Sequence, residues 1–397
     1  MSPAERRAGA SLAAIFALRM LGLFLILPVF AVHAHSAPGG DDAILVGLAI
    51  GAYGITQAFL QIAFGAASDR YGRKPVILFG LVLFALGSVV AALAADIHTV
   101  IVGRAIQGAG AISAAVTALA ADLTREQHRT KIMAMIGSSI GLVFALSMVT
   151  APLLYAAIGM AGIFWLTAAL AVGAMALTIW VVPAVPSARA APPRGTGGAL
   201  ADILRHGPLM RLNFGVFALH TIQTMMWVTV PAALVARGGL PLAGHWKIYL
   251  PAVLFSFAAM VPAVLAAERA GHFKQVFVGA VALLALVQLG LYAWGDGPWS
   301  IGLWLTLFFV AFNILEATQP SCISRIVSPA IKGTALGVYN TLQSAGLFLG
   351  GVVGGWLVHH YGEAGVGVCC GALALLWLAV AATMTPPSPG SRAVRYT

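Results

Sequence analysis

The sequence predicts an all-α membrane protein with twelve transmembrane helices, arranged as two pseudo-symmetric bundles of six. Its composition, the recurrence of apolar segments and a weak internal repeat lead to this prediction. Of the 397 residues, 60% are hydrophobic and 9% are charged, whereas soluble domains carry about 25% charged residues. Because so few charges cannot cover a water-soluble fold of this size, most of the surface must face lipid.

Apolar segments long enough to cross a bilayer, about 20 residues, recur twelve times along the chain. The first is expected to be a retained membrane helix and not a cleaved signal peptide. Its apolar run from Leu12 to Val32 exceeds the roughly 7–15 apolar residues of a secretory signal. The segment 183–209 is rich in Pro, Ala, Gly and Arg, which favours a cytoplasmic linker between an N-terminal bundle, 1–182, and a C-terminal bundle, 210–397. The expected spans are 12–33, 44–67, 75–94, 98–121, 132–157, 160–182, 210–235, 246–267, 274–294, 299–323, 333–358 and 364–385.

Lysine and arginine fall almost entirely on one side of these spans. When residues at the very end of a span are counted with the adjoining gap, eighteen of the 22 lie at the termini or in the gaps after even-numbered spans, two lie in the other gaps, and two lie well within spans. The positive-inside rule then predicts a multi-pass protein of the bacterial inner (cytoplasmic) membrane with both termini in the cytoplasm. The net charge of +10 is spread over short clusters, which argues against a nucleic-acid partner.

A weak repeat relates the two halves. Residues 68–72 read SDRYG and residues 267–271 read AERAG, at an offset of 199 residues. Two similar halves in the same orientation are typical of parallel-repeat transporters, in which the substrate site lies near the bilayer midplane between the halves.

The segment after the second span combines a tight turn with clustered charge. Gly72 allows a backbone conformation that other residues resist, and Pro75 suits the first turn of the next helix. One acid stands beside three bases at the membrane boundary. The residues concerned are Gly65, Asp69, Arg70, Gly72, Arg73 and Lys74.

This segment resembles the signature loop of the major facilitator superfamily, with Ala67 in place of the usual leucine. Residues 104–111, which read RAIQGAGA, resemble a motif of the drug/proton antiporters of that superfamily. Further segments in both halves resemble its YajR branch, whose members commonly carry a soluble C-terminal domain that we do not expect here. The G-x-x-x-G-P-x-x-G-G pattern of such antiporters is degraded around Pro152, so antiport and the direction of transport rest on the other motifs.

The resemblance implies a role for the acid of the loop. In that family Asp69 would sit against the N-terminus of the eleventh span, near Gly333, in the outward-facing state, where a helix dipole favours a carboxylate. Asp69, Arg73 and Asp122 would form a charge cluster that links the second, third and fourth helices. We hypothesise that this cluster latches the cytoplasmic gate; the alternative is that Asp69 merely caps the loop.

Three charged residues lie well inside predicted spans, away from their ends. Glu316 is the only acid well inside one, and an intramembrane carboxyl is a functional candidate by default. It could exchange protons, bind a cationic substrate or form a structural salt bridge. Arg104 could face the bundle interior or snorkel to the periplasmic boundary, and Arg19 is expected to snorkel to the cytoplasmic one or to serve a gate. Glu316, Arg104 and Asp69 are the candidates for proton coupling.

Polar side chains within other apolar spans are candidates for a substrate cavity. Each has the alternative of a helix-packing contact. The candidates are Arg19, Gln57, Gln61, His220, Gln223, Trp227, Asn313, Gln319, Asn340 and Gln343.

The sequence contains no nucleotide-binding, zinc or catalytic motif, so we expect neither an enzyme nor a cofactor, and the proton gradient as energy source. The leading hypothesis is a monomeric secondary transporter that expels small amphipathic or drug-like molecules in exchange for protons by alternating access. One alternative is an exporter of a sugar or another metabolite. The other is a membrane scaffold or sensor that transports nothing.

Overall fold

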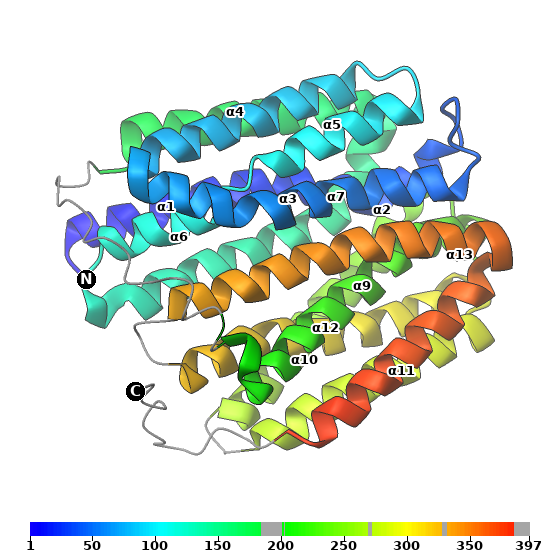
Figure 1. Cartoon of the computed structure of the whole chain (residues 1–397). Helices are drawn as coiled ribbons and strands as arrows, with labels where there is room; N and C mark the ends of the chain where they lie inside the picture. Colours follow the sequence, from blue (N-terminus) through cyan, green and yellow to red (C-terminus); the bar gives the residue numbers. More distant parts are fainter. Residues whose placement is uncertain (184–200, 202, 269–271, 328–331, 385–397) are drawn as a thin grey trace. The chain divides into compact units, whose positions relative to one another are not determined.

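The computed structural model describes residues 1–183, 201, 203–268, 272–327 and 332–384, and these form helices and connections without a strand. The chain divides into two compact units, Met1–Pro192 and Pro193–Thr397 (Figure 1). The division falls within the predicted linker 183–209, most of which lies outside the described residues.

The first unit consists of seven described α-helices and a closing π-helical turn. The longest, α7, packs against α1 and α4, and α5 packs against α3 and α4. The elements are α1 (Pro3–Phe24), α2 (Leu27–Ala34), α3 (Ala43–Tyr71), α4 (Arg73–Ala92), α5 (Ile97–Ala109), α6 (Ser113–Asp122), α7 (Glu126–Ala176) and η1 (Leu177–Val181).

The second unit is built from five long helices in its described part. Helix α13 packs against α9 and α11, while α12 packs against α10 and α11. The elements are α9 (Gly207–Ala236), η2 (Leu242–Gly244), α10 (Trp246–Glu268), α11 (Phe273–Trp294), α12 (Pro298–Ile326) and α13 (Lys332–Ala382).

Ten helical stretches of the described chain are long and apolar enough to cross a membrane. Helices α7 and α13, with 51 residues each, would be about 75 Å long if straight, far more than the roughly 30 Å hydrocarbon core. Each is interrupted by a non-helical glycine, Gly159 (φ 67°, ψ −177°) and Gly362 (φ 67°, ψ −166°). In Figure 1 the ribbon of α13 turns back between its orange and red parts. These glycines fall where the sequence predicts a boundary between two spans, so the structure is consistent with twelve crossings.

Gly159→Ala is expected to lower the free energy of unfolding by about 1–3 kcal/mol, because its backbone conformation is one that essentially only glycine adopts. An added Cβ would meet nothing within 4 Å, so the effect comes from the backbone alone. Gly137→Ala, in the helical part of α7 with the same open space, is the matched control and should be neutral or stabilising by about 0.5–1 kcal/mol. Thermal unfolding of the detergent-purified protein measures both. Equal effects would show that the break at Gly159 carries no conformational strain.

Two predicted spans are found in the structure but are interrupted within. The span 12–33 is divided between α1 and α2, and α1 begins already at Pro3, where Ser2 and Glu5 form a capping box. The predicted span 98–121 corresponds to one apolar helical stretch, Ile97–Asp122, but this stretch is not a continuous helix. The chain leaves the helix at Gly110 (φ −74°, ψ 54°), between α5 and α6.

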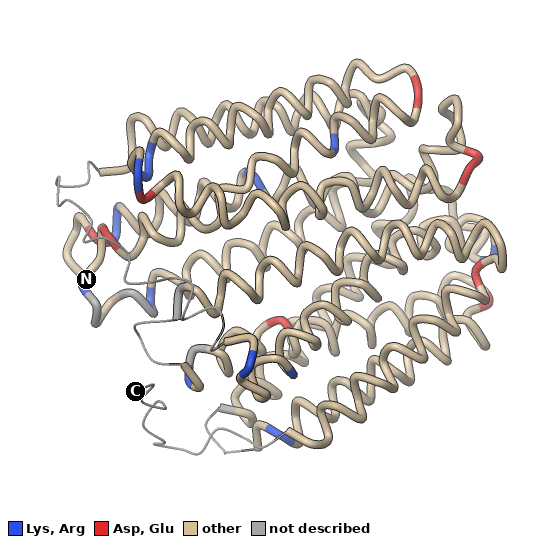
Figure 2. The backbone as a smooth tube through the Cα atoms, viewed as in Figure 1, with Lys and Arg blue, Asp and Glu red and all other residues tan. Residues whose placement is uncertain are grey.

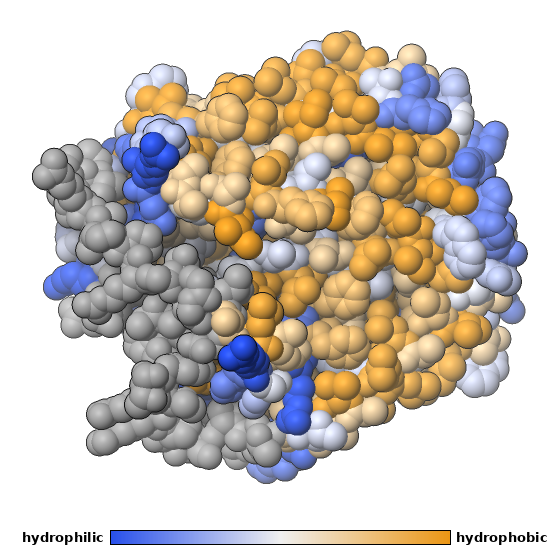
Figure 3. Space-filling view, viewed as in Figure 1, coloured by the Kyte–Doolittle hydropathy of each residue, from blue (hydrophilic) through white to orange (hydrophobic). Residues whose placement is uncertain are grey.

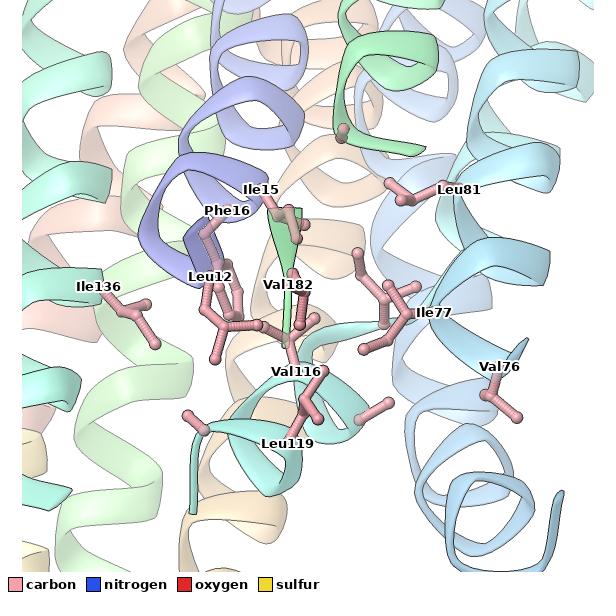
Figure 4. Close-up of a cluster of buried hydrophobic side chains, with 14 of the residues drawn as sticks. Leu12, Ile15, Phe16, Val76, Ile77, Leu81, Val116, Leu119, Ile136 and Val182 are labelled. Atoms are coloured by element: carbon pink, nitrogen blue, oxygen red, sulfur yellow. The ribbon is translucent and has the colours of Figure 1, made fainter. Parts of the chain in front are cut away.

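The core of the first unit is apolar. Leu12 and Phe16 of α1, Ile77 of α4, Val116 of α6 and Ile136 of α7 are buried in one cluster (Figure 4). The outer surface is apolar as well, because large side chains such as Phe59 of α3 are exposed. Figure 3 shows apolar residues over much of the visible face. Such an exterior suits lipid rather than water.

Most charged residues of the first unit lie toward the ends of its helices (Figure 2). At one end, Arg125 binds Glu5 at the start of α1 (Nε–Oε1 2.9 Å). Arg7 donates from Nε to the carbonyl at the end of η1 (3.1 Å). The hydrogen bonds from the Arg125 side chain and from Ser2 hold the pKa of Glu5, which precedes the predicted span, well below its usual range. The starts of α1 and α7 and the end of η1 therefore lie at the same end of the first unit. The orientation predicted by the positive-inside rule requires this for the N-terminal bundle.

Candidate functional site

One arginine joins three helices of the first unit. Arg73, the first residue of α4, contacts Asp69 of α3 through Nη1 and donates from the same atom to the Ser68 hydroxyl (2.8 Å). Its Nε donates to Oδ2 of Asp122, the last residue of α6, at 3.0 Å. The Arg73 side chain is 15% exposed, against 44% and 38% for the two carboxylates. The guanidinium thus ties the ends of α3 and α6 to the beginning of α4.

The other charged residues of the loop have separate partners. Gly72 has φ 95° and separates α3 from α4, which allows the sharp turn. Lys74 donates from Nζ to the carbonyl of Val182 at 2.6 Å. Arg70 is exposed, with its guanidinium 5.3 Å from the centroid of the Tyr71 ring. Of the predicted gate residues, the structure therefore brings Asp69, Arg73 and Asp122 together and leaves Arg70 and Lys74 outside this cluster.

Two further parts of the gate hypothesis involve other elements. Gly65 of α3 faces α6, since an added Cβ would lie 3.6 Å from the Cβ of Ala114. The supposed partner of Asp69 near Gly333 belongs to the second unit, and the residues just before it, 328–331, lie outside the described part of the chain. The latch stays a prediction.

Arg19 of α1 is fully buried, with 0% exposure. Its Nη2 donates to the Tyr53 hydroxyl (2.7 Å), the Gly110 carbonyl (3.0 Å) and Oε1 of Gln57 (3.2 Å). Its guanidinium carbon lies 5.5 Å from the centroid of the Phe84 ring. The expectation that Arg19 snorkels to the cytoplasmic boundary is wrong, because neutral acceptors hold its guanidinium inside the unit.

Arg104 of α5 is also buried, at 2% exposure. Its Nη1 donates to Oε1 of Gln107 (2.8 Å), and Nε and Nη2 approach two carbonyls of α3 at 3.4 and 3.5 Å. The Gln107 amide in turn donates to the Ser88 hydroxyl of α4 at 2.8 Å. The structure therefore places Arg104 in the interior of the unit and not at the periplasmic boundary.

Tyr53 of α3 is the residue that both arginines contact. Arg19 bonds its hydroxyl, and the Arg104 guanidinium carbon lies 5.3 Å from its ring centroid. The close approach of α5 to α3 makes this possible, because a Cβ on Gly108 would lie 2.1 Å from the Tyr53 carbonyl oxygen. The break at Gly110 then leaves a carbonyl outside the helical ladder for Arg19. Glycine spacing in the sequence thus places the two cations around one aromatic ring.

In the second unit, Glu316 of α12 meets side chains from two other helices. Its Oε2 lies 3.7 Å from Nε2 of His220 on α9, and its Oε1 accepts from the amide of Gln343 on α13 at 3.4 Å. The Glu316 side chain is 39% exposed within this unit, whereas His220 is 5% exposed. A carboxyl, an imidazole and an amide thus share one polar site inside an apolar unit.

The contacts of His220 relate its protonation state to this site. Its Nδ1 lies 3.0 Å from the Val216 carbonyl, and its Nε2 lies 2.7 Å from the Gln343 amide nitrogen. When Nδ1 carries the hydrogen and donates to that carbonyl, Nε2 accepts from Gln343 and the ring is neutral. A proton added at Nε2 would instead oppose that amide and face the carboxylate of Glu316.

Two other candidates of the second unit make packing contacts. Trp227 of α9 is 2% exposed, and its ring centroid lies 6.2 Å from that of Tyr249 and 6.3 Å from that of Phe309. Asn313 of α12 donates from Nδ2 to the Ser256 hydroxyl of α10 at 3.0 Å. These contacts fit the packing alternative for both residues.

For the remaining cavity candidates the structure gives burial and a few neighbours, but no shared site. Gln223 is buried and Asn340 is half-buried. The amides of Gln61 and Gln319 are buried without a hydrogen-bond partner among the described residues. Gln319 faces α9, because a Cβ on Gly215 would lie 2.8 Å from its Oε1.

The candidates for proton coupling in the first unit do not meet. Arg104 approaches the carbonyl of Ala49 near the start of α3, whereas Asp69 lies near the end of that helix. Twenty residues of helix separate them, which corresponds to about 30 Å. Asp69 and Arg104 therefore cannot exchange a proton directly.

A family model described as "Major Facilitator Superfamily" matches residues 12–351. The chain belongs to the Major Facilitator Superfamily. It is accordingly a multi-pass membrane transporter and not an enzyme.

Individual relatives of this superfamily member cover nearly its whole length. "Inner membrane transport protein YajR" of Escherichia coli is 46% identical over 98% of this chain and 85% of its own. "Multidrug resistance protein MdtH" of Aeromonas hydrophila is 26% identical over 87% of this chain and 85% of its own. Among solved structures, a D-xylose-proton symporter superposes with a TM-score of 0.75 at 15% identity, covering 97% of this chain and 99% of that one. This last likeness shows the fold alone.

Several residues of the sites around Arg73, around Arg19 and Arg104, and around Glu316 were not predicted from the sequence. Tyr53 and Ser88 were not singled out, although each is polar within a predicted span. Ser68 precedes the signature acid, yet its contact with Arg73 was not foreseen. The polarity of Tyr53 and Ser88 within apolar helices was a usable signal, whereas the pairing of His220 with Glu316 left no trace in sequence spacing.

Proposed function

We propose that this chain is a proton-coupled exporter of small amphipathic or drug-like molecules, working by alternating access in the bacterial inner membrane. It acts as a monomer without a cofactor, with both termini in the cytoplasm. A proton moving inward supplies the energy, about 2.3 kcal/mol per charge per 100 mV.

The observation that carries this proposal is the Glu316 site. A carboxyl within an apolar helix is expensive and marks an ion or proton pathway by default. The neighbouring His220 and Gln343 offer one titratable and one neutral partner. The carboxylate can therefore accept a proton and pass it on, while the amide keeps its hydrogen bond to either protonation state.

Two further observations support export. The relatives named as multidrug resistance proteins align with most of the chain. A sugar or metabolite exporter would need many polar contacts in its cavity, and the sequence offers only a modest number of candidates for them. A scaffold or sensor would have no need of Glu316 or of the charge cluster around Arg73.

Reconstitution into liposomes with an internal pH dye tests the proposal. With an inward-directed proton gradient imposed, a panel of lipophilic cations, organic anions, antibiotics and sugars is presented to the protein. We expect that some amphipathic members trigger proton movement above that of protein-free liposomes. Transport without proton movement would overturn the coupling, and a response to sugars alone would overturn the substrate class.

A further inference from the structure

The first unit buries two arginines without a carboxylate. Among its described side chains, the acids that form ion pairs lie in connections or at helix ends, as Asp69 and Asp122 do. Neither Arg19 nor Arg104 has an acidic partner there, although the two are 0% and 2% exposed. An unpaired charge inside a membrane protein costs several kcal/mol.

Arg19 in particular keeps unused hydrogen-bonding capacity. Its three hydrogen bonds, to Tyr53, Gln57 and the Gly110 carbonyl, all leave from Nη2. Its Nε and Nη1 are buried without any partner, which leaves three N–H bonds of the guanidinium unsatisfied. Arg104 differs, because each of its three nitrogens has an acceptor within 3.5 Å. The arginine of α1 is therefore the one that lacks a ligand.

The neighbours of Arg19 cannot neutralise it. The three acceptors are neutral, and the aromatic faces of Tyr53 and Phe84, at 5.8 and 5.5 Å, offer only a quadrupole. The Arg104 guanidinium against the same Tyr53 ring adds a second positive charge. This part of the unit therefore carries a positive potential that favours an anion.

We propose that Arg19 binds the anionic group of the transported molecule, so that this transporter carries amphipathic organic anions such as carboxylates, sulfonates or phosphate esters. The free N–H groups of Nε and Nη1 and the charge of the guanidinium would hold the acidic group. Leu23, Phe24 and Phe84, which pack in one cluster with Tyr53, would contact the apolar body. Arg19 is closed off in this structure, so the ligand enters in another state of the transport cycle. That the bound anion is transported rests on the proposed function, whereas anion binding at Arg19 does not depend on it.

Equilibrium binding without a proton gradient tests this site. The full chain is placed in phosphatidylcholine nanodiscs and titrated calorimetrically with naphthalenesulfonate, naphthalenesulfonamide and naphthyltrimethylammonium, with empty nanodiscs subtracted. The three probes share one apolar body and differ in charge. We expect saturable binding of the sulfonate and much weaker binding of the neutral and cationic probes.

Matched variants assign the binding to Arg19. In Arg19→Gln the sulfonate affinity should fall about tenfold to a hundredfold, since hydrogen bonds to a charged group are lost. Arg205→Gln, an exposed arginine of the other unit, should leave the affinity unchanged. Tyr53→Phe keeps the charge and removes one acceptor from Nη2, so it should bind at least as well as the unmodified protein. If Arg19→Gln fails to fold, the Tyr53→Phe variant still tests the proposal.

Several outcomes would overturn the assignment. They are preference for the cationic probe, equal binding of sulfonate and sulfonamide, undiminished affinity in a folded Arg19→Gln, or weakened affinity in Tyr53→Phe. A repeat in nanodiscs with phosphatidylglycerol separates a soluble anion from a lipid phosphodiester, because a lipid that occupies the site would suppress sulfonate binding. A failed proton-flux experiment with intact sulfonate binding would reject the coupling and leave the anion site in place.

Discussion

Glu316→Gln is expected to reduce substrate-driven proton movement to the level of protein-free liposomes, while exchange of substrate across the membrane without a gradient persists. The substitution keeps the size of the side chain and removes its capacity to gain or lose a proton. It therefore resembles a carboxyl that is permanently protonated. Coupling should stop, because no proton can be released in each cycle.

The geometry around Glu316 explains why exchange should survive. The Gln343 amide donates to Oε1 of Glu316, and the introduced amide retains a carbonyl oxygen that can accept this bond. The loss of attraction between the carboxylate and His220, which are 3.7 Å apart, concerns only the protonated imidazole. The helices α9, α12 and α13 therefore keep their contacts in the variant.

Paired assays on one preparation check the result. The internal pH dye reports proton movement, and counterflow of a labelled substrate reports exchange. Asp296→Asn, at an exposed acid between α11 and α12 of the same unit, is the control and should behave as the unmodified protein. Normal proton movement in Glu316→Gln would remove Glu316 from the coupling mechanism.

Arg73→Gln is expected to destabilise the protein by about 1–2 kcal/mol and to reduce transport. Arg73 contacts Asp69, Asp122 and Ser68 at once, and hydrogen bonds to charged groups contribute roughly 1.5–3 kcal/mol each when buried. The two carboxylates are 44% and 38% exposed, so solvent screening reduces that figure. Without the guanidinium, the carboxylates on α3 and α6 lose their common counter-charge.

The neighbouring Arg70 provides the matched control. It lies three residues earlier in the same loop, is exposed, and touches only the ring of Tyr71 among the contacts described. Arg70→Gln should therefore change stability by no more than about 0.5 kcal/mol. Arg73→Lys should fall between the two, because an ammonium keeps the charge but lacks the planar fork that reaches both carboxylates.

Thermal unfolding in detergent measures this series, at roughly 2–4 °C per kcal/mol for a unit of this size. Transport in liposomes is followed on the same samples. Equal losses in Arg70→Gln and Arg73→Gln would mean that positive charge in the loop, rather than the bridge across three helices, is what matters. An unchanged Tm in Arg73→Gln would contradict the stabilising role of the Arg73 contacts with α3 and α6.

Much of this transporter was predictable from local sequence. The apolar runs located the long apolar helices and the breaks near Gly159 and Gly362, because the transfer energy of a segment from water to lipid depends on its own residues. The signature loop indicated the family, and the resemblance, not local spacing, predicted that Asp69 and Arg73 meet across the turn at Gly72. The same resemblance added Asp122, which no local pattern could have found because it lies some 50 residues farther along the chain.

The sequence by itself thus determined which segments enter the membrane, the superfamily, and the charged loop between two helices. Only the tertiary structure decided that Arg19 turns inward to Tyr53, that the chain breaks at Gly110 to supply a carbonyl, and that His220 meets Glu316. The physical reason lies in the range of the interactions. Hydropathy sums over neighbouring residues, whereas the meeting of two polar side chains depends on how each helix is rotated about its axis and how closely it packs.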